Sequence, residues 1–181
     1  KEIPQTYCNR GEGRFGPADI AIVDNLAYVT NGDTKSGLSS CKVVGKKLID
    51  CKTTAHGKLA AQDGIVAQND DIYISNMCHN SISVCKRNGS SLVECKRWKH
   101  PDFGEPSGLK ISNGLLFLVN HAGGEKDGSI VVCTLKTNPI KCAATPEKFN
   151  GPYNIAFSSN GQNAFIIDNE AKIWSCDTDF K

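Results

Sequence analysis

The chain repeats one pattern of four short apolar segments at an interval of about 45 residues. The clearest copy runs from Gly64 to Cys95 as four β-type segments separated by turn residues. The first segments of the four copies begin at Ile20, Ile65, Leu109 and Ile155, so the intervals are 45, 44 and 46 residues. A repeat of this length with four strands is typical of β-propeller blades. We therefore predict an all-β, four-bladed β-propeller with four-stranded antiparallel blades.

The turn chemistry agrees with this prediction. Asn88-Gly89 separates the third and fourth strands of the second copy. Asn-Gly favours a type I′ turn, because both central residues of that turn need a positive φ, and this turn joins antiparallel strands tightly. The second strand of each copy ends in an amide or acid side chain, at Asn31, Asn76, Asn120 and Asp168.

The cysteines follow the same repeat. Third strands end at Cys41, Cys85, Cys133 and Cys176, and fourth strands end at Cys51, Cys95 and Cys142. Regular spacing without CxxC pairs favours disulfides over zinc, and so an oxidising compartment, secreted or periplasmic. Repeat position predicts four disulfides and leaves Cys78 unpaired: Cys41–Cys51, Cys85–Cys95, Cys133–Cys142 and Cys8–Cys176.

The fourth copy ends at Lys181 without a fourth strand of its own. The segment that ends at Cys8 aligns with the fourth strands of the other copies. We therefore expect the N-terminal strand to complete the last blade and close the ring within one complete chain. The predicted blades of this single domain cover residues 14–56, 57–100, 101–146, and 147–181 together with 1–13.

This arrangement predicts a monomer and leaves two dimers as alternatives. In one, two four-bladed halves share a single eight-bladed ring. In the other, Cys78 links two chains through a disulfide. Cys78 lies beside His79, which could activate a thiolate, but a buried or free surface thiol is the favoured interpretation.

Charge and hydropathy exclude two classes of partner. The net charge of +2 and the pI near 8.1 are too mild to indicate nucleic acid as a partner. No apolar run approaches the roughly 20 residues that a membrane-spanning helix needs, so we expect no membrane span.

The segment Ala27-Tyr28-Val29-Thr30-Asn31, preceded by Gly16-Pro17 and a DIAI strand, resembles the YVTN-type β-propeller repeat. The other copies keep the looser forms YISN, FLVN and FIID. The broader relatives are NHL-like propellers. The resemblance implies a propeller fold over nearly the whole chain, but such propellers usually carry six or seven blades and lack these cysteine pairs.

The strand-end asparagines Asn31, Asn76 and Asn120 have a structural and a functional interpretation. Recurrence at one register favours the structural one, in which each amide caps its strand in an Asx turn. In the functional one, these side chains bind a ligand at the mouth of the channel. His121 follows Asn120 in the longest second–third strand loop, equivalent to the loop of His79, so the two histidines could share that face.

Asp19, Asn154 and Asp168 come from the two blades beside the closure point. The resemblance implies lactonase-like relatives that hold a divalent cation in the channel with Glu, Asn and Asp. Here no glutamate occupies such a position, and Gly64 and Gly108 stand at the sites equivalent to Asp19. Hard cations prefer several oxygen ligands. We therefore expect no cofactor and leave a channel-bound divalent cation, held by these three residues, as an alternative.

These observations favour a secreted or periplasmic binding scaffold that recognises a protein or glycan partner through the loop face. The alternatives are a lactonase-like metal-dependent hydrolase with its site in the channel, and a multivalent lectin. Propellers host both binding proteins and enzymes, so the fold does not choose among these functions.

Overall fold

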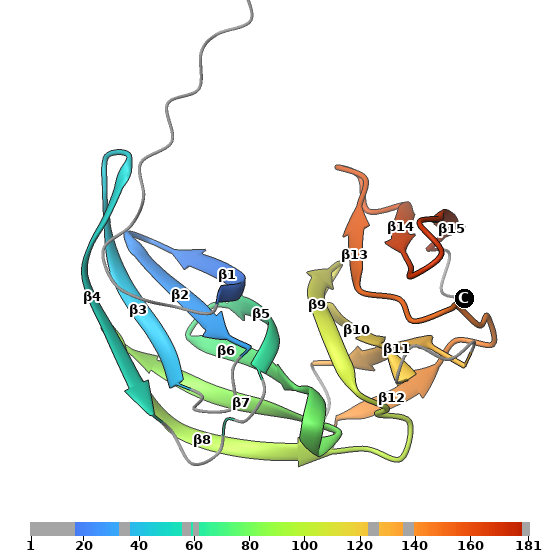
Figure 1. Ribbon diagram of the computed structural model, residues 1–181, viewed down its shortest axis with the longest axis horizontal. Helices are drawn as coiled ribbons and strands as arrows, with labels where there is room; N and C mark the ends of the chain where they lie inside the picture. The colour runs from blue at the N-terminus through green and yellow to red at the C-terminus, as the bar shows by residue number, and fades with distance from the viewer. Residues whose placement is uncertain are drawn as a thin grey trace, which may run out of the picture.

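The protein is all-β, and its four sheets are arranged as a four-bladed β-propeller (Figure 1). The computed structural model describes residues 17–32, 37–55, 59, 62–122, 127–135 and 140–178. The described residues include a short 3₁₀ helix, η1 (Met77–His79). The predicted fold class is confirmed.

The first two blades each contain four antiparallel strands in sequence order. Blade 1 consists of β1 (Pro17–Val23), β2 (Leu26–Asn31), β3 (Gly37–Val44) and β4 (Lys47–Ala55). Blade 2 consists of β5 (Gln62–Gln68), β6 (Asp71–Asn76), β7 (Ser81–Asn88) and β8 (Ser91–Lys99).

Blade 3 has four strands, whereas blade 4 has three among the described residues. Blade 3 consists of β9 (Pro106–Ser112), β10 (Leu115–Asn120), β11 (Ser129–Thr134) and β12 (Lys141–Ala144). Blade 4 consists of β13 (Asn154–Phe157), β14 (Asn163–Ile167) and β15 (Ile173–Asp177). The N-terminal strand predicted to complete blade 4 lies outside the described residues.

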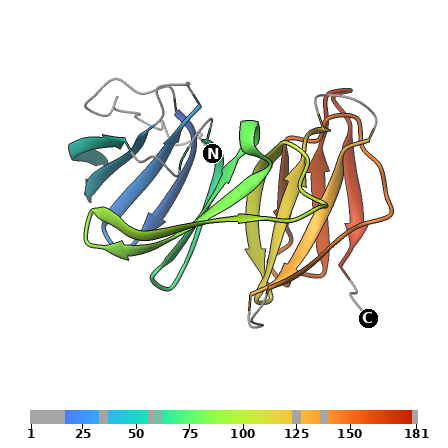
Figure 2. The same ribbon diagram turned by 90° about the horizontal axis from the view of Figure 1, so that it is seen from below.

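The first strand of each blade lies on the inside of the array. β1 contacts β5, β5 contacts β9, and β9 contacts β13. The four blades therefore follow one another along an arc. Blades 1 and 4 are its two ends, with β1 and β13 apart in both views (Figures 1 and 2).

Three apolar layers hold the blades together. Each layer joins one face of a blade to the opposite face of the next, because alternate residues of a strand point to opposite sides of its sheet. Tyr28 and Leu38 of blade 1 pack with Ile65 and Ile74 of blade 2. The equivalent positions form the layers between blades 2 and 3 and between blades 3 and 4.

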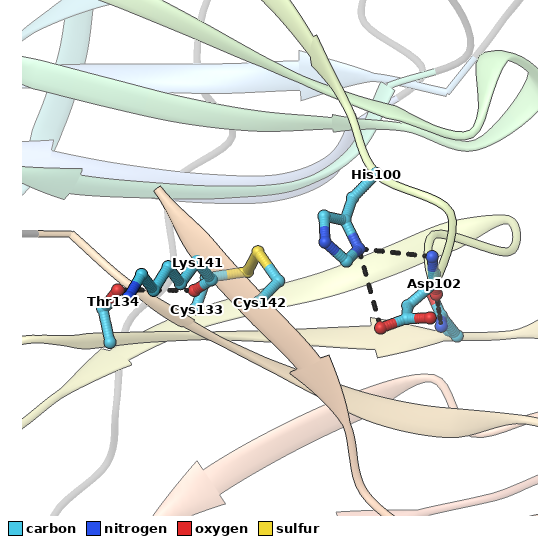
Figure 3. The surroundings of a disulfide bond; sticks show 7 residues. His100, Asp102, Cys133, Thr134, Lys141 and Cys142 are labelled. Atoms are coloured by element: carbon cyan, nitrogen blue, oxygen red, sulfur yellow. Dashed lines mark hydrogen bonds and ion pairs between the residues drawn. A yellow bond between two sulfur atoms is a disulfide. The ribbon is translucent and has the colours of Figure 1, made fainter. Parts of the chain in front are cut away.

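Three of the predicted disulfides are present: Cys41–Cys51, Cys85–Cys95 and Cys133–Cys142. Each joins the third and fourth strands of its blade. Figure 3 shows the Cys133–Cys142 bond between β11 and β12, with the Thr134 hydroxyl donating to the Lys141 carbonyl at 3.4 Å on the same strand pair. The fourth predicted pair stays a prediction, because Cys8 lies outside the described residues.

The spacing of the cysteines differs between blades, and a bulge absorbs the difference. The pairs of blades 1 and 2 are 10 residues apart, whereas the pair of blade 3 is 9 residues apart. In blade 1, Ser40 pairs with Lys52 and Lys42 pairs with Ile49, so Cys41 faces two residues. Blade 2 has the same irregularity, whereas Cys133 and Cys142 pair directly. A bulge of this kind accommodates one extra residue in one strand.

Candidate binding site

The strand-end asparagines use their amide groups to hold the loops between second and third strands. Asn31 Nδ2 donates to the Ser39 hydroxyl at 3.1 Å, and Asn76 Nδ2 donates to the Ser83 hydroxyl at 3.0 Å. Asn120 Nδ2 donates to the Ser129 hydroxyl at 3.1 Å. All three asparagines are buried. These bonds cross from the second strand to the third, so they fasten a strand pair instead of forming a simple Asx turn.

Asp168 takes the equivalent place in blade 4 and has a different set of partners. Its Oδ1 accepts from the backbone N–H groups of Glu170 at 3.0 Å and Lys172 at 3.1 Å. Its Oδ2 accepts from Trp174 Nε1 at 2.7 Å. Burial acts to raise its pKa, but these hydrogen bonds prevail and hold the pKa of Asp168 below its usual range. Both carboxylate oxygens are therefore engaged within blade 4.

Asp19 and Asn154 lie on the inner strands at opposite ends of the arc. Asp19 Oδ1 accepts from Ile20 N at 2.8 Å, and its Oδ2 accepts from Ile65 N of the next blade at 3.1 Å. Asn154 Oδ1 accepts from Ile155 N at 2.9 Å. The structure does not gather Asp19, Asn154 and Asp168 into one ligand set. Within the described part of the chain, no group of three His, Cys, Asp or Glu side chains could hold a metal ion.

His121 instead stands at the centre of a group that joins blades 3 and 4. Its ring packs on Tyr153 with the ring centres 4.8 Å apart. Its Nδ1 lies 3.8 Å from Glu105 Oε2, and its Nε2 lies 3.5 Å from Asn169 Nδ2. We call these four residues the His121 cluster. Tyr153 is half-exposed, so the cluster presents an aromatic surface edged by polar atoms.

One polar atom of this cluster lacks a hydrogen-bond partner among the described residues. Nδ1 of His121 is buried, and the separation from Glu105 is too long for a hydrogen bond. A buried ring nitrogen without a hydrogen-bond partner lowers the stability of the fold. Such an atom therefore usually has a functional role or binds a water, an ion or a ligand. The backbone N–H of His121 donates to the Glu105 carbonyl at 3.1 Å, which fixes the position of the ring relative to blade 3.

Asp63 adds a carboxylate from blade 2. Burial raises its pKa, the neighbouring charge of Asp19 raises it further, and His121 opposes the shift. Asp63 therefore lies within electrostatic reach of both Asp19 and His121. The Asp63 carbonyl also accepts a hydrogen bond from the Thr30 hydroxyl at 2.7 Å, which ties the start of β5 to blade 1.

Sequence reasoning found His121 but missed the groups around it: Asp63, Glu105, Tyr153 and Asn169. Asp63 directly precedes Gly64, and Tyr153 directly precedes Asn154, so both stand at the start of an inner strand. Comparing the residues one position before Gly64, Gly108 and Asn154 would have found Asp63 and Tyr153. Glu105 and Asn169 carry no such signal, because they lie in loops of unlike length.

The other histidines and the unpaired cysteine do not join this site. His100 Nδ1 lies 3.6 Å from Asp102 Oδ2, on the loop after β8 (Figure 3). Cys78 and His79 are both exposed on η1, and Cys78 is a free thiol. His56 lies outside the described residues. The monomer stays a prediction, and the dimer linked through Cys78 stays an alternative to it.

An open cavity of about 810 Å³ lies between blades 3 and 4. Its walls include Ile130, Phe149, Trp174 and Cys176. Phe149 and Trp174 meet edge to face with ring centres 5.4 Å apart. Burial raises the pKa of the Cys176 thiol, and the carboxylates of Glu147 and Asp177 act in the same direction.

The sequence matches no protein-family model and no curated protein. Solved structures resemble the fold. The computationally designed Ika4 protein gives a TM-score of 0.59 at 9% identity, with 97% of this chain and 99% of that chain covered. At such identity the likeness shows the fold alone.

Two natural proteins give higher TM-scores over part of their length. A nidogen–laminin complex gives 0.69 at 14% identity, covering 89% of this chain and 60% of that chain. A gluconolactonase from Xanthomonas campestris gives 0.68 at 17% identity, covering 92% of this chain and 59% of that chain. The chain thus spans about three fifths of the length of these two.

No helix among the described residues is long and apolar enough to cross a membrane. The three disulfides are typical of proteins from oxidising compartments.

Proposed function

We propose that the chain is a binding scaffold, secreted or periplasmic, that recognises a protein or glycan partner through its loop face. The His121 cluster is the recognition site in this proposal. The observation that carries it is the half-exposed Tyr153 ring packed at a tilt on His121, whose buried Nδ1 has no hydrogen-bond partner among the described residues. We also keep the YVTN-type repeat as the proposed family.

The chemistry of the cluster favours a partner that brings a flat apolar surface and hydrogen-bond donors. The face of Tyr153 suits a sugar ring or an aliphatic side chain, because an aromatic ring gives a large contact area with little entropy to lose. Glu105 and Asp63 supply carboxylates near His121. These acids favour sugar hydroxyls or a lysine or arginine of a partner over anionic ligands.

Variants of the cluster test this proposal. The chain is applied to a glycan array and to an array of surface peptides from extracellular proteins. We expect specific ligands of the wild-type protein to be lost in the double variant His121→Ala and Tyr153→Ala. Lys46→Ala serves as the control, because Lys46 is exposed on the β3–β4 turn, away from the cluster. Equal binding by all three proteins would contradict the proposal.

A lactonase-like hydrolase is the second candidate, and it rests on the fold shared with the gluconolactonase. In this chain the charges of Asp19 and His121 both act on Asp63, so these three residues are the candidates for such a site. Metal analysis of the purified protein and hydrolysis of gluconolactone test this candidate. A stoichiometric divalent metal, together with hydrolysis that Asp63→Asn abolishes, would replace the binding proposal.

A multivalent lectin would need similar sites on several blades. Among the described residues, the His121 cluster joins blades 3 and 4, and the second–third strand loop of blade 2 carries η1 instead. We therefore prefer one site per chain. Titration with any glycan found on the array gives the stoichiometry and checks this preference.

A further inference from the structure

The hairpin of β7 and β8 carries the triplet Asn88-Gly89-Ser90 at its tip. Asn88 is the one asparagine of the chain that is followed, two positions later, by serine or threonine. Asn-x-Ser/Thr, in which x is not proline, is the acceptor sequence for N-linked glycans in secreted proteins. The triplet alone does not establish a modification, because an asparagine beside a glycine can also serve a turn.

The structure shows that Asn88 does not form the turn. Asn88 is the last residue of β7 and pairs with Ser91, so the two residues of the turn are Gly89 and Ser90. The positive φ of this turn, 56°, lies at Gly89, whereas Asn88 keeps the backbone of a strand. The type I′ turn that the sequence predicted, with Asn88 and Gly89 at its centre, is therefore wrong.

The equivalent turn of blade 1 forms without an asparagine. Val44 pairs with Lys47 across Gly45 and Lys46, and Gly45 has a φ of 57°. Val44 thus occupies in blade 1 the place that Asn88 occupies in blade 2. Glycine supplies the unusual conformation in both turns, because it adopts a positive φ without a steric cost. The residue before the glycine can therefore be valine as well as asparagine.

The side chain of Asn88 has no structural task elsewhere either. It is exposed, and its amide has no hydrogen-bond partner among the described residues. The strand-end asparagines differ in both respects, since Asn76, for example, is buried and donates to the Ser83 hydroxyl. Gly89 and Ser90 are exposed as well. A sugar attached to Asn88 therefore breaks no contact of the fold.

The neighbours of Asn88 fix the hairpin tip on blade 1. The Tyr28 hydroxyl donates to the Gly89 carbonyl, and the turn lies beside blade 1 (Figure 2). Arg87 donates to the Asp24 carboxylate of blade 1 at 2.7 Å and to the Asp70 carboxylate at 3.2 Å. These bonds hold the backbone on both sides of Asn88 and leave its own side chain at the surface.

The tip lies far from the His121 cluster. The loop before β7 is next to that cluster, because Asn80 Oδ1 accepts from Glu105 N at 2.8 Å. β7 runs from Ser81 at this loop to Asn88 at its other end, and seven strand residues correspond to about 23 Å. A glycan on Asn88 therefore leaves the cluster accessible.

We propose that Asn88 carries an N-linked glycan, with Ser90 completing the acceptor. The donor is an oligosaccharide joined to a lipid through a diphosphate. A bond forms between Asn88 Nδ2 and the anomeric carbon of the first sugar, and the bond from that carbon to the diphosphate oxygen breaks. The electron pair of the broken bond leaves with the lipid diphosphate. One proton of Nδ2 passes to a base of the transferase.

A glycan at this tip protects an open sheet edge. β8 is the outer strand of blade 2, and the strand order places no further described strand beside it. Such an edge can pair with another chain, and a bulky, hydrated sugar at its end opposes that pairing. The glycan therefore favours solubility.

This inference goes beyond the proposed function. It requires the secreted of the two proposed compartments, but it does not involve the His121 cluster. Its test measures the mass of the chain and not binding, so a failure here is distinguishable from a failure of the proposed function.

Enzymatic removal of the glycan tests the proposal. The chain is produced with a secretion signal in cultured eukaryotic cells and recovered from the medium. We expect peptide-N-glycosidase to lower the apparent mass of the wild-type protein. In water labelled with heavy oxygen, the same treatment should convert Asn88 into an aspartate that carries the label, which peptide mass spectrometry detects.

Three variants locate the modification. Asn88→Gln and Ser90→Ala should each abolish the change in mass. Ser91→Ala is the matched control and should keep it, because Ser91 is exposed and adjacent but lies outside the triplet. Circular dichroism checks that each variant is folded.

Two results would overturn the proposal. One is a wild-type protein whose mass the enzyme leaves unchanged, or a change that persists in Asn88→Gln. The other is an aspartate at position 88 without the heavy oxygen, because spontaneous deamidation of Asn-Gly before the treatment yields that product.

Discussion

At the scale of single residues, two glycines set the distance between the inner strands. A Cβ at Gly64 would collide with the Ser107 carbonyl and would lie 2.8 Å from Leu109 N, both backbone atoms of β9. A Cβ at Gly108 would lie 2.7 Å from the Tyr153 carbonyl. Backbone atoms cannot move aside as a flexible side chain can. Glycine therefore stands here because the blades pack too closely for a side chain.

We expect Gly64→Ala to lower the free energy of unfolding by about 1–3 kcal/mol, since it forces apart two packed strands. Gly104→Ala is the matched control, because a Cβ there would meet nothing within 4 Å. Chemical denaturation of both variants measures the difference. Equal stability of the two variants would contradict the close approach of β5 and β9.

Ionisation of Asp63 destabilises the fold, whereas ionisation of a salt-bridged acid stabilises it. The contribution of Asp63 to stability therefore falls as the pH rises. Burial and the charge of Asp19 raise its folded-state pKa, so the fold disfavours the ionised form. The resulting penalty is absent below the ordinary Asp pKa of about 3.9 and grows as the pH rises from there through the raised value. We expect Asp63→Asn to be more stable than the wild type near neutral pH and no more stable at low pH. Urea denaturation across this pH range measures the difference, and a constant difference would contradict the assignment.

The sequence located the repeated polar positions but did not predict the contacts that their side chains make. The recurrence of Asn31, Asn76 and Asn120 correctly located one repeated position, but each amide fastens a second strand to a third-strand serine. The repeat reveals such partners only in part: Ser39 and Ser83 pair with the equivalent residues Val29 and Ile74, whereas Ser129 pairs with Asn120. The His121 cluster depends on loop positions that no repeat specifies.

At the scale of strands, the repeat predicted most of the features that the structure shows. Strand order, the three disulfides and the second-strand bounds at Asn31, Asn76 and Asn120 all followed from the period. The bulges in blades 1 and 2 were not predicted. They place Asp50 and Glu94, directly before the fourth-strand cysteines, at φ values of 53° and 52°. Only the difference between 10- and 9-residue spacings hints at them.

The disulfides staple the third strand of each blade to its fourth. Replacing both Cys85 and Cys95 by serine should lower the free energy of unfolding by about 2.5–3 kcal/mol, because a loop of roughly ten residues regains its freedom in the unfolded state. Cys78→Ser is the control, since Cys78 is an exposed free thiol. Denaturation without reductant compares the two variants. An equally small effect in both would show that the β7–β8 pair holds without its bond.

At the scale of the whole molecule, the chain is an array of equivalent blades with unequal surroundings. Three apolar layers bury the facing sides of neighbouring blades, whereas Ile20 on β1 and Phe165 on β14 are partly exposed. The sequence predicted the equivalence of the blades, which the structure shows, and a ring closed by the N-terminal strand, which stays a prediction because that strand lies outside the described residues. Periodicity alone does not determine how far each blade rotates from the last, because that angle depends on how side chains interlock between sheets.

The pair Phe117 and Phe165 tests how much burial between blades stabilises the chain, because the two residues share one repeat position. Phe117 is buried between blades 3 and 4 and packs on Phe157 with ring centres 4.6 Å apart, so Phe117→Ala should cost about 3–5 kcal/mol at any protein concentration. Phe165 is 41% exposed, so Phe165→Ala should cost far less. Thermal denaturation of both variants measures the difference, and an equal loss of stability in both would contradict the burial of Phe117 between blades 3 and 4.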